Sequence, residues 1–310
     1  MGYIRFENIV KNFGDTQVLK NINLDIEKGQ LVTLLGPSGC GKSTLLRCLA
    51  GLESVTSGKV WLDGKDITNE EPRKRDIGMV FQQYSLFPNL TVEKNVAFGL
   101  QLKKMPKNQI DTKVKEMLEI VGMGDKGKSY PLQLSGGQQQ RAALARAIVT
   151  EPKVLLLDEP LSAIDALLRK SLQMEIRRIQ KETDITAIFV THDQNEAMVM
   201  SDMIHLLYDG RIEQSAQPVQ MYAHPATKFA ASFIGSYNLL SSEDFKKMTG
   251  SSYLWKDRMM HAVIFFREKS WTESRREMCF VMESAARVVR FMRMFCFRKQ
   301  VFLRNLRTAG

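Results

Sequence analysis

Apolar and β-branched residues gather along the chain in short runs with the lengths of β-strands. The early runs read YIRFENIV, VLKNINLDI and LVTLLG, and two later continuous runs are typical of strands buried on both faces. Together the runs occupy residues 3–10, 18–26, 31–36, 154–157 and 185–190. Because helix-forming segments alternate with the buried runs, the pattern predicts an α/β fold with parallel strands.

A different spacing of apolar residues begins after Pro106. There the apolar positions recur every three or four residues, as on one face of a helix. These positions are Ile110, Val114, Met117, Leu118 and Val121. We therefore expect an amphipathic helix in a segment inserted between the early and the later strands.

The third apolar run leads into a glycine-rich segment, and a helix-forming segment follows it. Gly36, Gly41, Lys42 and Ser43 fit the phosphate-loop pattern GxxxxGK followed by Ser or Thr. Such a loop turns its backbone N–H groups toward phosphate oxygens, while its lysine faces the β- and γ-phosphates and its hydroxyl binds Mg²⁺. A chance glycine-rich turn is the alternative, and the strand and helix on either side argue against it. The predicted nucleotide-binding residues here are Gly36, Pro37, Ser38, Gly39, Cys40, Gly41, Lys42, Ser43 and Thr44.

Two adjacent carboxylates follow the buried run at 154–157. Ligands of open α/β sheets bind at the carboxyl ends of the strands, which would bring Asp158 close to the phosphate loop. Asp158 suits a Mg²⁺-holding role, and Glu159 could polarise the water that attacks a phosphate. A helix cap is the alternative for an acidic pair, and the phosphate loop makes the metal and water roles the better interpretation.

His192 follows the buried run at 185–190 by one residue. A lone histidine is usually structural. Here it follows a strand expected to lie parallel to the Asp158 strand, so its side chain would lie at the same sheet edge. We interpret His192 as a residue that senses the γ-phosphate.

The segment LSGGQQQRAALARA, residues 134–147, holds no carboxylate, histidine or cysteine. Ser135, Gly136 and Gly137 would begin the helix that runs through the following residues, so their N–H groups and the helix dipole form a second anion cradle. Taken alone, the segment could be an ordinary glycine-capped surface helix.

Taken together, these motifs resemble the ATP-binding subunits of ABC transporters, whose signature is LSGGQ. The resemblance covers about the first three quarters of the chain. It implies a phosphate-loop ABC ATPase core with a helical subdomain, ATP and Mg²⁺ as ligands, and ATP hydrolysis. It also implies a homodimer of two chains packed head to tail, in which Ser135, Gly136, Gly137 and Gln138 of one chain close over the ATP of the other.

Further roles follow from the resemblance alone. Phe13 matches the aromatic residue that stacks on adenine, and Gln82 matches the glutamine that contacts Mg²⁺ or water and joins the core to the helical subdomain. Asp165 matches the loop that crosses to the other subunit, beside Ile164 where the family more often has Leu. The apolar segment LFPNLTVEKNVAFGL matches the region that receives a short helix of the membrane subunit.

Several stretches, among them TLLRCLAGLE and FQQYSLFPNLTV, resemble the importer branch of the family. That branch implies separate transmembrane permease subunits, an extracytoplasmic solute-binding protein, and a peripheral position at the cytoplasmic face of the cell membrane. Within this branch, the segment PVQMYAHPATKFAASFIGSYNLL most resembles the polyamine, ferric iron and aminoethylphosphonate importers.

Two other functions remain as alternatives. A non-transport ABC ATPase normally carries two cassettes or a long coiled-coil insertion, and this sequence has one cassette without that insertion. A nucleic-acid-associated ATPase would rest on the basic C-terminal tail, which holds no recognisable nucleic-acid-binding module. We therefore expect no nucleic-acid partner.

Composition narrows the class further. The chain is 44% hydrophobic and 25% charged, as in ordinary globular proteins. No run approaches the roughly 18 apolar residues of a membrane span, and MGYIRFENIV lacks the apolar core of a signal peptide. The four cysteines form no CxxC pair and are expected to be free thiols: Cys40, Cys48, Cys279 and Cys296.

Composition changes towards the C-terminus. Residues 251–310 hold 13 Lys and Arg against 5 Asp and Glu. The net charge of this segment, +8, is most of the chain's net charge of +10. We expect an ABC ATP-binding domain over 1–235, with its helical subdomain at about 88–150, and a degenerate β-rich, TOBE-like region over 236–310. Residues 265–308 contain no glycine or proline, so they lack the turns of a compact β-domain. Either 265–310 is a basic amphipathic helix or its reading frame has slipped, leaving a disordered tail. We favour the slip.

Overall fold

The computed structural model describes residues 2–81, 85–162, 166–235, 237–240, 263–266 and 278–279. The chain forms two compact units, residues 1–221 and 222–310. Within the described ranges, no helix combines the length and the apolar composition needed to cross a membrane.

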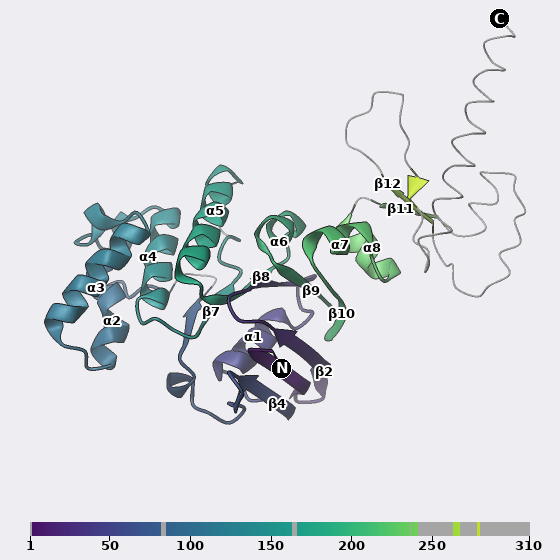
Figure 1. The fold of residues 1–310 in the computed structure, drawn as a ribbon, viewed down its shortest axis with the longest axis horizontal. Helices are drawn as coiled ribbons and strands as arrows, with labels where there is room; N and C mark the ends of the chain where they lie inside the picture. Colours follow the sequence, from purple (N-terminus) through teal and green to yellow (C-terminus); the bar gives the residue numbers. More distant parts are fainter. Residues whose placement is uncertain are drawn as a thin grey trace, which may run out of the picture. The chain divides into compact units, whose positions relative to one another are not determined.

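A six-stranded sheet forms the centre of the first unit (Figure 1). Its strand order is β10-β9-β3-β8-β7-β6; neighbouring strands are parallel except for the antiparallel edge strand β10. The strands are β3 (Leu31–Leu35), β6 (Ile77–Val80), β7 (Val154–Asp158), β8 (Thr186–Thr191), β9 (Met203–Tyr208) and β10 (Arg211–Ala216). Because β3, β7 and β8 run in one direction, the loops that follow them leave the sheet at the same edge.

An antiparallel sheet, in the order β2-β1-β4-β5, packs against the first sheet through helix α1. Its strands are β1 (Ile4–Phe13), β2 (Thr16–Ile26), β4 (Ser57–Leu62) and β5 (Lys65–Asp66), and the helix is α1 (Lys42–Ala50). Leu45 and Leu49 of α1 share a core with Phe6 of β1 and with Val32 and Leu34 of β3. The helix that follows the glycine-rich loop is thus fixed between two sheets.

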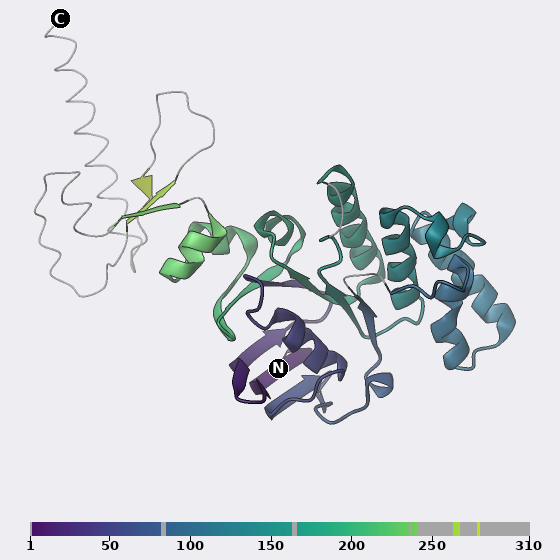
Figure 2. The ribbon, with the colours of Figure 1, turned by 180° about the vertical axis from the view of Figure 1, so that it is seen from behind.

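The helices of the insert form a second layer of the first unit. They are α2 (Val92–Leu102), α3 (Lys107–Ile120) and α4 (Gly136–Ile148), with short 3-10 turns at Gly124–Lys126 and Pro131–Gln133; a third 3-10 turn, Pro72–Lys74, lies outside the insert, before β6. Figures 1 and 2 show α2, α3 and α4 packed together on one side of the central sheet. The other helices that begin in the first unit are α5 (Ala166–Thr183), α6 (Gln194–Met200) and α7 (Pro218–Ala223), the last of which spans the boundary of the two units.

Strand β7 shows why its sequence is a continuous apolar run. Val154 and Leu156 contribute to the core shared with α1, whereas Leu155 and Leu157 contribute to the core shared with the inserted helices. Successive side chains of a strand point to opposite faces, so a strand with a core on both faces needs apolar residues throughout.

The second unit is described only in short segments. These are α8 (Lys228–Ile234) and the antiparallel strands β11 (Tyr237–Leu240), β12 (Val263–Phe266) and β13 (Met278–Cys279). The predicted TOBE-like region and the predicted slip at 265–310 fall mainly outside the described residues and stay predictions. The domain boundary near residue 235 is likewise a prediction, while the compact units divide at 221/222.

The predicted α/β fold class with an inserted helical layer is confirmed. All five predicted strands are present, and the run predicted at 185–190 forms β8 one residue later. Asp184, the residue after α5, has a φ of +51°, which is a left-handed conformation. This turn ends the helix and its connection, and the strand begins after it. The predicted amphipathic helix is α3, whose apolar side chains face the core.

Candidate functional site

The glycine-rich loop connects the C-terminal end of β3 to the first turn of α1. At Gly36 a Cβ atom would lie 2.2 Å from the carbonyl oxygen of Leu207 in β9, so a larger residue would push the loop away from the sheet. Gly41 caps α1 with a φ of +103°, which residues other than glycine rarely adopt. The sequence therefore directs the positive end of α1 toward the edge at which β7 and β8 also end.

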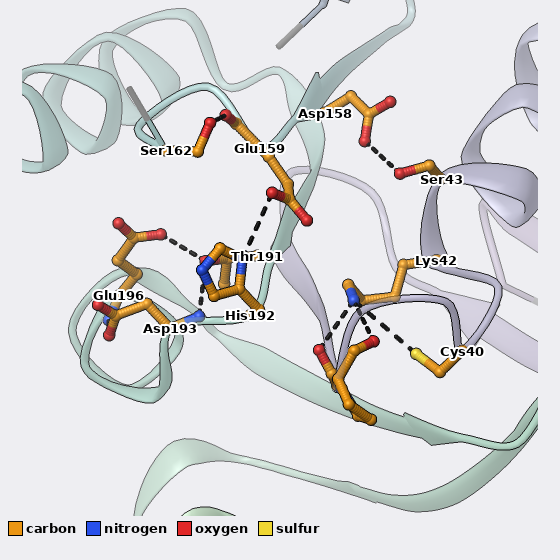
Figure 3. Close-up of polar contacts among 12 residues, drawn as sticks. Cys40, Lys42, Ser43, Asp158, Glu159, Ser162, Thr191, His192, Asp193 and Glu196 are labelled. Atoms are coloured by element: carbon orange, nitrogen blue, oxygen red, sulfur yellow. Dashed lines mark hydrogen bonds and ion pairs between the residues drawn. The ribbon is translucent and has the colours of Figure 1, made fainter. Parts of the chain in front are cut away.

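Lys42 lies inside this loop rather than in solvent. Its side chain is only 4% exposed, and its Nζ donates hydrogen bonds of 2.8 Å to the carbonyl oxygens of Gly36 and Pro37 (Figure 3). Cys40 contacts the same ammonium group, with its Sγ 3.8 Å from Nζ. Burial raises the pKa of the Cys40 thiol, although Lys42 pulls that pKa down, so we expect a protonated thiol at this position.

Ser43 and Asp158 meet at the end of β7. The Ser43 hydroxyl donates a 2.7 Å hydrogen bond to Oδ1 of Asp158, whose side chain is buried (Figure 3). One hydroxyl and one carboxylate are hard oxygen donors of the kind that Mg²⁺ takes together with phosphate oxygens and water. The pair fits the predicted metal site, and among the described residues no cluster of three His, Cys, Asp or Glu offers another.

Glu159 and His192 form a second pair beside the first. Nδ1 of His192 lies 3.4 Å from Oε2 of Glu159, with side-chain exposures of 53% and 18% (Figure 3). Glu159 holds the left-handed φ of +45°, and its N–H donates to the carbonyl of Val190 in β8 at 3.1 Å. This backbone turn directs the carboxylate along the sheet edge toward His192.

A small cavity of about 40 Å³ lies next to this pair. Its lining is Glu159, Ser162, Arg169, Thr191, His192, Asp193 and Glu196. A larger cavity of about 450 Å³, lined by Lys113 of α3 and by Ile185 and Thr186 at the start of β8, contains none of the predicted site residues. Parallel sheets bind their ligands at the carboxyl ends of the strands, whereas the larger cavity lies at the start of β8. The smaller cavity is therefore the one beside the predicted site residues.

The LSGGQ segment forms the start of α4, as predicted. Ser135 caps the helix, since its Oγ accepts from the N–H of Gln138 at 3.3 Å, while Oε1 of Gln138 accepts from the N–H of Ser135 at 2.9 Å. Gly136 has open space where a Cβ would be, which leaves its backbone accessible. Figures 1 and 2 show α4 with the inserted helices, away from α1, so the two anion cradles belong to different parts of the first unit.

The remaining predicted residues are placed as follows. Phe13 ends β1 with its ring 46% exposed, and Nζ of Lys11 lies 4.6 Å from the ring centroid. Ser38 and Gly39 are exposed on the glycine-rich loop, and Thr44 is half-buried in α1. Gln82 and Asp165 lie outside the described residues. The predicted roles of all these side chains remain proposals.

Sequence reasoning missed Thr191, Glu196 and Arg169, three polar residues around the small cavity. Thr191 and Glu196 are 3% and 4% exposed. The one available signal was the spacing of Asp193 and Glu196, which is that of a helix N-cap and its third helical residue. The expectation of free thiols agrees with Cys40 and Cys48, both buried and unpaired; the side chains of Cys279 and Cys296 lie outside the described set.

Comparisons with known proteins show which proteins this chain is similar to. The profile of a family described as ABC transporter matches residues 19–162. The sulfate/thiosulfate import ATP-binding protein CysA of Gloeobacter violaceus is 54% identical over 237 residues, covering 76% of this chain and 69% of that protein. The spermidine/putrescine import ATP-binding protein PotA of Thermobifida fusca is 54% identical over 242 residues, covering 77% and 63%. This chain therefore spans less than two thirds of that relative.

Two further comparisons extend the pattern. The Fe(3+) ions import ATP-binding protein FbpC of Brucella abortus is 48% identical over 262 residues, covering 84% of this chain and 74% of that protein. Among solved structures, a dimeric ATP-binding cassette in a post-hydrolysis state, bound to ADP and Pi, matches with a TM-score of 0.62 at 34% identity. That match covers 69% of this chain and 98% of the solved one.

Proposed function

Because this chain belongs to the ABC transporter family, we propose that it is the ATP-hydrolysing subunit of an importer. It works as a homodimer and drives separate permease subunits. The observation that carries the proposal is the meeting of Lys42, Ser43, Asp158, Glu159 and His192 at one edge of the central sheet.

The chain's own residues divide the work of hydrolysis. The N–H groups of the glycine-rich loop and the Lys42 ammonium hold the phosphates of ATP. Ser43 and Asp158 would hold Mg²⁺, with Gln82 as a further contact, and the ion would neutralise charge on the phosphate oxygens. Glu159 orients the attacking water and draws off its proton. His192, held beside Glu159, donates a hydrogen bond to the γ-phosphate.

Positioning and charge stabilisation are the main requirements of phosphoryl transfer, so an anion cradle on a second chain is useful. The Ser135 cap and the first N–H groups of α4 supply that cradle. A site assembled from two chains links hydrolysis to dimer closure, and closure is a movement that a transporter can use. Phe13 adds an exposed aromatic face for adenine, and Asp165 lies in the loop that reaches the partner.

Import is proposed from the relatives. Each of the three relatives compared above is named as an import ATP-binding protein. This chain would accordingly lie at the cytoplasmic face of the membrane, attached through permease subunits and served by an extracytoplasmic solute-binding protein. Polyamine, ferric iron and phosphonate remain the proposed solutes, and sulfate joins them because one relative handles it.

A mixed-dimer experiment tests the composite ATPase. Lys42→Ala should lose ATP binding, and Ser135→Arg should block the cradle offered to the partner, so each variant alone is inactive. In a heterodimer of the two, one site carries both defects and the other carries none. Mixing the inactive variants should therefore restore about a quarter of wild-type activity, if dimers form at random.

The control places both substitutions in one chain, pairs that chain with wild type, and isolates the heterodimer by two different affinity tags so that wild-type homodimers are removed. Each site of this heterodimer then has one defect, so the heterodimer contributes nothing. Activity that does not recover in the first mixture, or an isolated control heterodimer that is active, would contradict the composite site. Uptake of labelled polyamine, ferric iron, phosphonate and sulfate by vesicles containing the chain and its permease then tests import. A chain that binds nucleic acid and no permease would favour the nucleic-acid-associated alternative.

A further inference from the structure

A buried polar cluster lies behind the loop that carries His192. Thr191 is the last residue of β8, and its hydroxyl donates a 2.5 Å hydrogen bond to Oε2 of Glu196 in α6 (Figure 3). Both side chains are almost completely buried. Burial raises the pKa of Glu196, while the hydrogen bond from Thr191 acts in the opposite direction. A buried carboxylate by itself adds little to the free energy of unfolding, so the role of Glu196 depends on the groups that it holds in place.

Side chains hold the backbone on both sides of His192. Thr191 Oγ1 accepts from the N–H of Asp193 at 3.0 Å, so this hydroxyl bridges the loop and Glu196. Asp193 Oδ1 in turn accepts from the N–H groups of Asn195 at 2.7 Å and Glu196 at 3.3 Å. The residues before and after His192 are thereby tied to the first turn of α6, which restricts where the imidazole can lie.

Arg169 connects this cluster to another part of the site. Its Nε lies 3.7 Å from Oε1 of Glu196, and its Nη1 lies 3.6 Å from Oδ2 of Asp193. Arg169 is in the first turn of α5, and α5 begins at Ala166, the residue that follows Asp165. The carboxylate of Glu196 therefore contacts both the His192 loop and the helix that continues from the predicted crossing loop.

We propose that Glu196 is a positioning residue for hydrolysis: through Thr191 and Arg169 it fixes the His192 loop against the start of α5. The imidazole then meets the γ-phosphate and Glu159 in one geometry. The proposal rests on the proposed ATPase function. Small misplacements of a reacting group cost large factors in rate, so a residue without contact to ATP can affect turnover strongly.

The test compares Glu196→Gln with a matched control at Asp202, which lies between the end of α6 and the start of β9. Glu196→Gln keeps the shape and a hydrogen-bond acceptor for Thr191 but removes the charge facing Arg169. Asp202 is an acidic residue that accepts from Arg177 of α5 at 2.9 Å and from the N–H of Leu31 at 2.8 Å, outside the small cavity. Asp202→Asn therefore removes a comparable partner of α5 without altering the His192 loop.

We expect Glu196→Gln to lower kcat for ATP about tenfold, with KM for ATP changed by less than about twofold. Thr191→Val should give a similar loss, and Thr191→Ser should restore kcat because it keeps the hydroxyl. Asp202→Asn should lower the melting temperature while kcat stays close to wild type. The imidazole NMR signals of His192 should shift in Glu196→Gln and remain in place in Asp202→Asn.

Unchanged kcat and unchanged His192 signals in Glu196→Gln would overturn the proposal, even with a lowered melting temperature. So would a Thr191→Ser variant as slow as Thr191→Val. Absence of ATPase activity in the wild-type chain would instead overturn the proposed function, and the NMR comparison would still decide whether Glu196 positions His192.

Discussion

The Ser43 hydroxyl and the Asp158 carboxylate, 115 positions apart in the sequence, lie 2.7 Å from each other. The contact joins the first turn of α1 to the end of β7, so it depends on the packing of the central sheet rather than on either motif alone. Two oxygen donors held side by side can take a divalent ion with little rearrangement of the backbone.

Asp158→Asn should raise the Mg²⁺ concentration needed for ATP hydrolysis. The amide keeps an acceptor for Ser43 but loses the negative charge that attracts the ion, a change of about ten- to a hundredfold in metal affinity. Titration of ATPase activity with Mg²⁺ measures the shift. Equal Mg²⁺ dependence in the variant and the wild type would contradict a metal-holding role for Asp158.

Glu159→Gln should bind ATP with near-normal affinity and hydrolyse it at least about a hundredfold more slowly, because the residue no longer takes the proton of the attacking water. Loss of the negative charge beside the γ-phosphate should also let ATP-bound dimers accumulate. Single-turnover hydrolysis and light scattering with ATP measure the two effects. Turnover at the wild-type rate would remove Glu159 from the mechanism.

His205 should make the protein less stable in mild acid. Burial lowers the pKa of this histidine from 6.5 to about 4; its Nδ1 is 2.7 Å from the Ser215 hydroxyl, and its Nε2 has no hydrogen-bond partner among the described residues. The unfolded chain takes up the proton first, so stability is full above about pH 6.5 and falls until about pH 4. His205 should account for a loss of about 2 kcal/mol in the free energy of unfolding between about pH 7 and about pH 5.

Denaturant titrations of wild type and His205→Gln at both pH values provide the measurement. The glutamine variant lacks the titrating group, so its stability should fall less between the two pH values, whatever its stability at neutral pH. A parallel fall in both proteins would show that other groups cause the acid sensitivity.

Asn95→Ala should weaken attachment to the permease more than it weakens ATP hydrolysis. The Asn95 side chain is fully buried; its Oδ1 accepts from the N–H of Phe87 at 2.8 Å, and its Nδ2 donates to the carbonyls of Phe87, Leu90 and Thr91 at 3.0 to 3.1 Å. It thus shapes the apolar segment that resembles the family's permease-contact region. Removal should lower the free energy of unfolding by about 1 to 3 kcal/mol.

Gln180→Ala is the matched control for Asn95→Ala. Gln180 is a buried amide that donates to the carbonyls of Gly29 and Ile185 at 2.8 and 2.9 Å, away from that segment. Both variants should lose stability, and only Asn95→Ala should lose co-purification with the permease. Equal co-purification of the permease with the two variants would show that Asn95 has no specific role in permease docking.

The sequence was sufficient for those parts of the fold and the site that depend on local pattern. The run at Val154–Leu157 is apolar throughout, and that pattern alone indicates a strand covered on both faces. The strand-loop-helix context of Lys42 and the rule that parallel strands end at one sheet edge then brought Asp158 and His192 to the same place.

The parts that could not be predicted depend on side chains that meet through packing. Glu196 is a charged residue in the polar first turn of a helix, where a solvent-exposed side chain would be expected, yet Thr191 and Arg169 enclose it. Asn95 and His205 likewise acquire their roles only from the neighbours that the fold provides. Neither residue type nor spacing records which distant group will be within hydrogen-bond distance.

The left-handed backbone of Glu159 has a consequence for how this position tolerates change. A glutamate at a φ of +45° is strained by roughly 1 kcal/mol relative to asparagine or glycine, which adopt this conformation more readily. Directed evolution for heat resistance alone would therefore favour replacing the residue that we propose to orient the attacking water. Selection for ATP turnover would act in the opposite direction, so we expect the strained glutamate to be retained only where hydrolysis is selected.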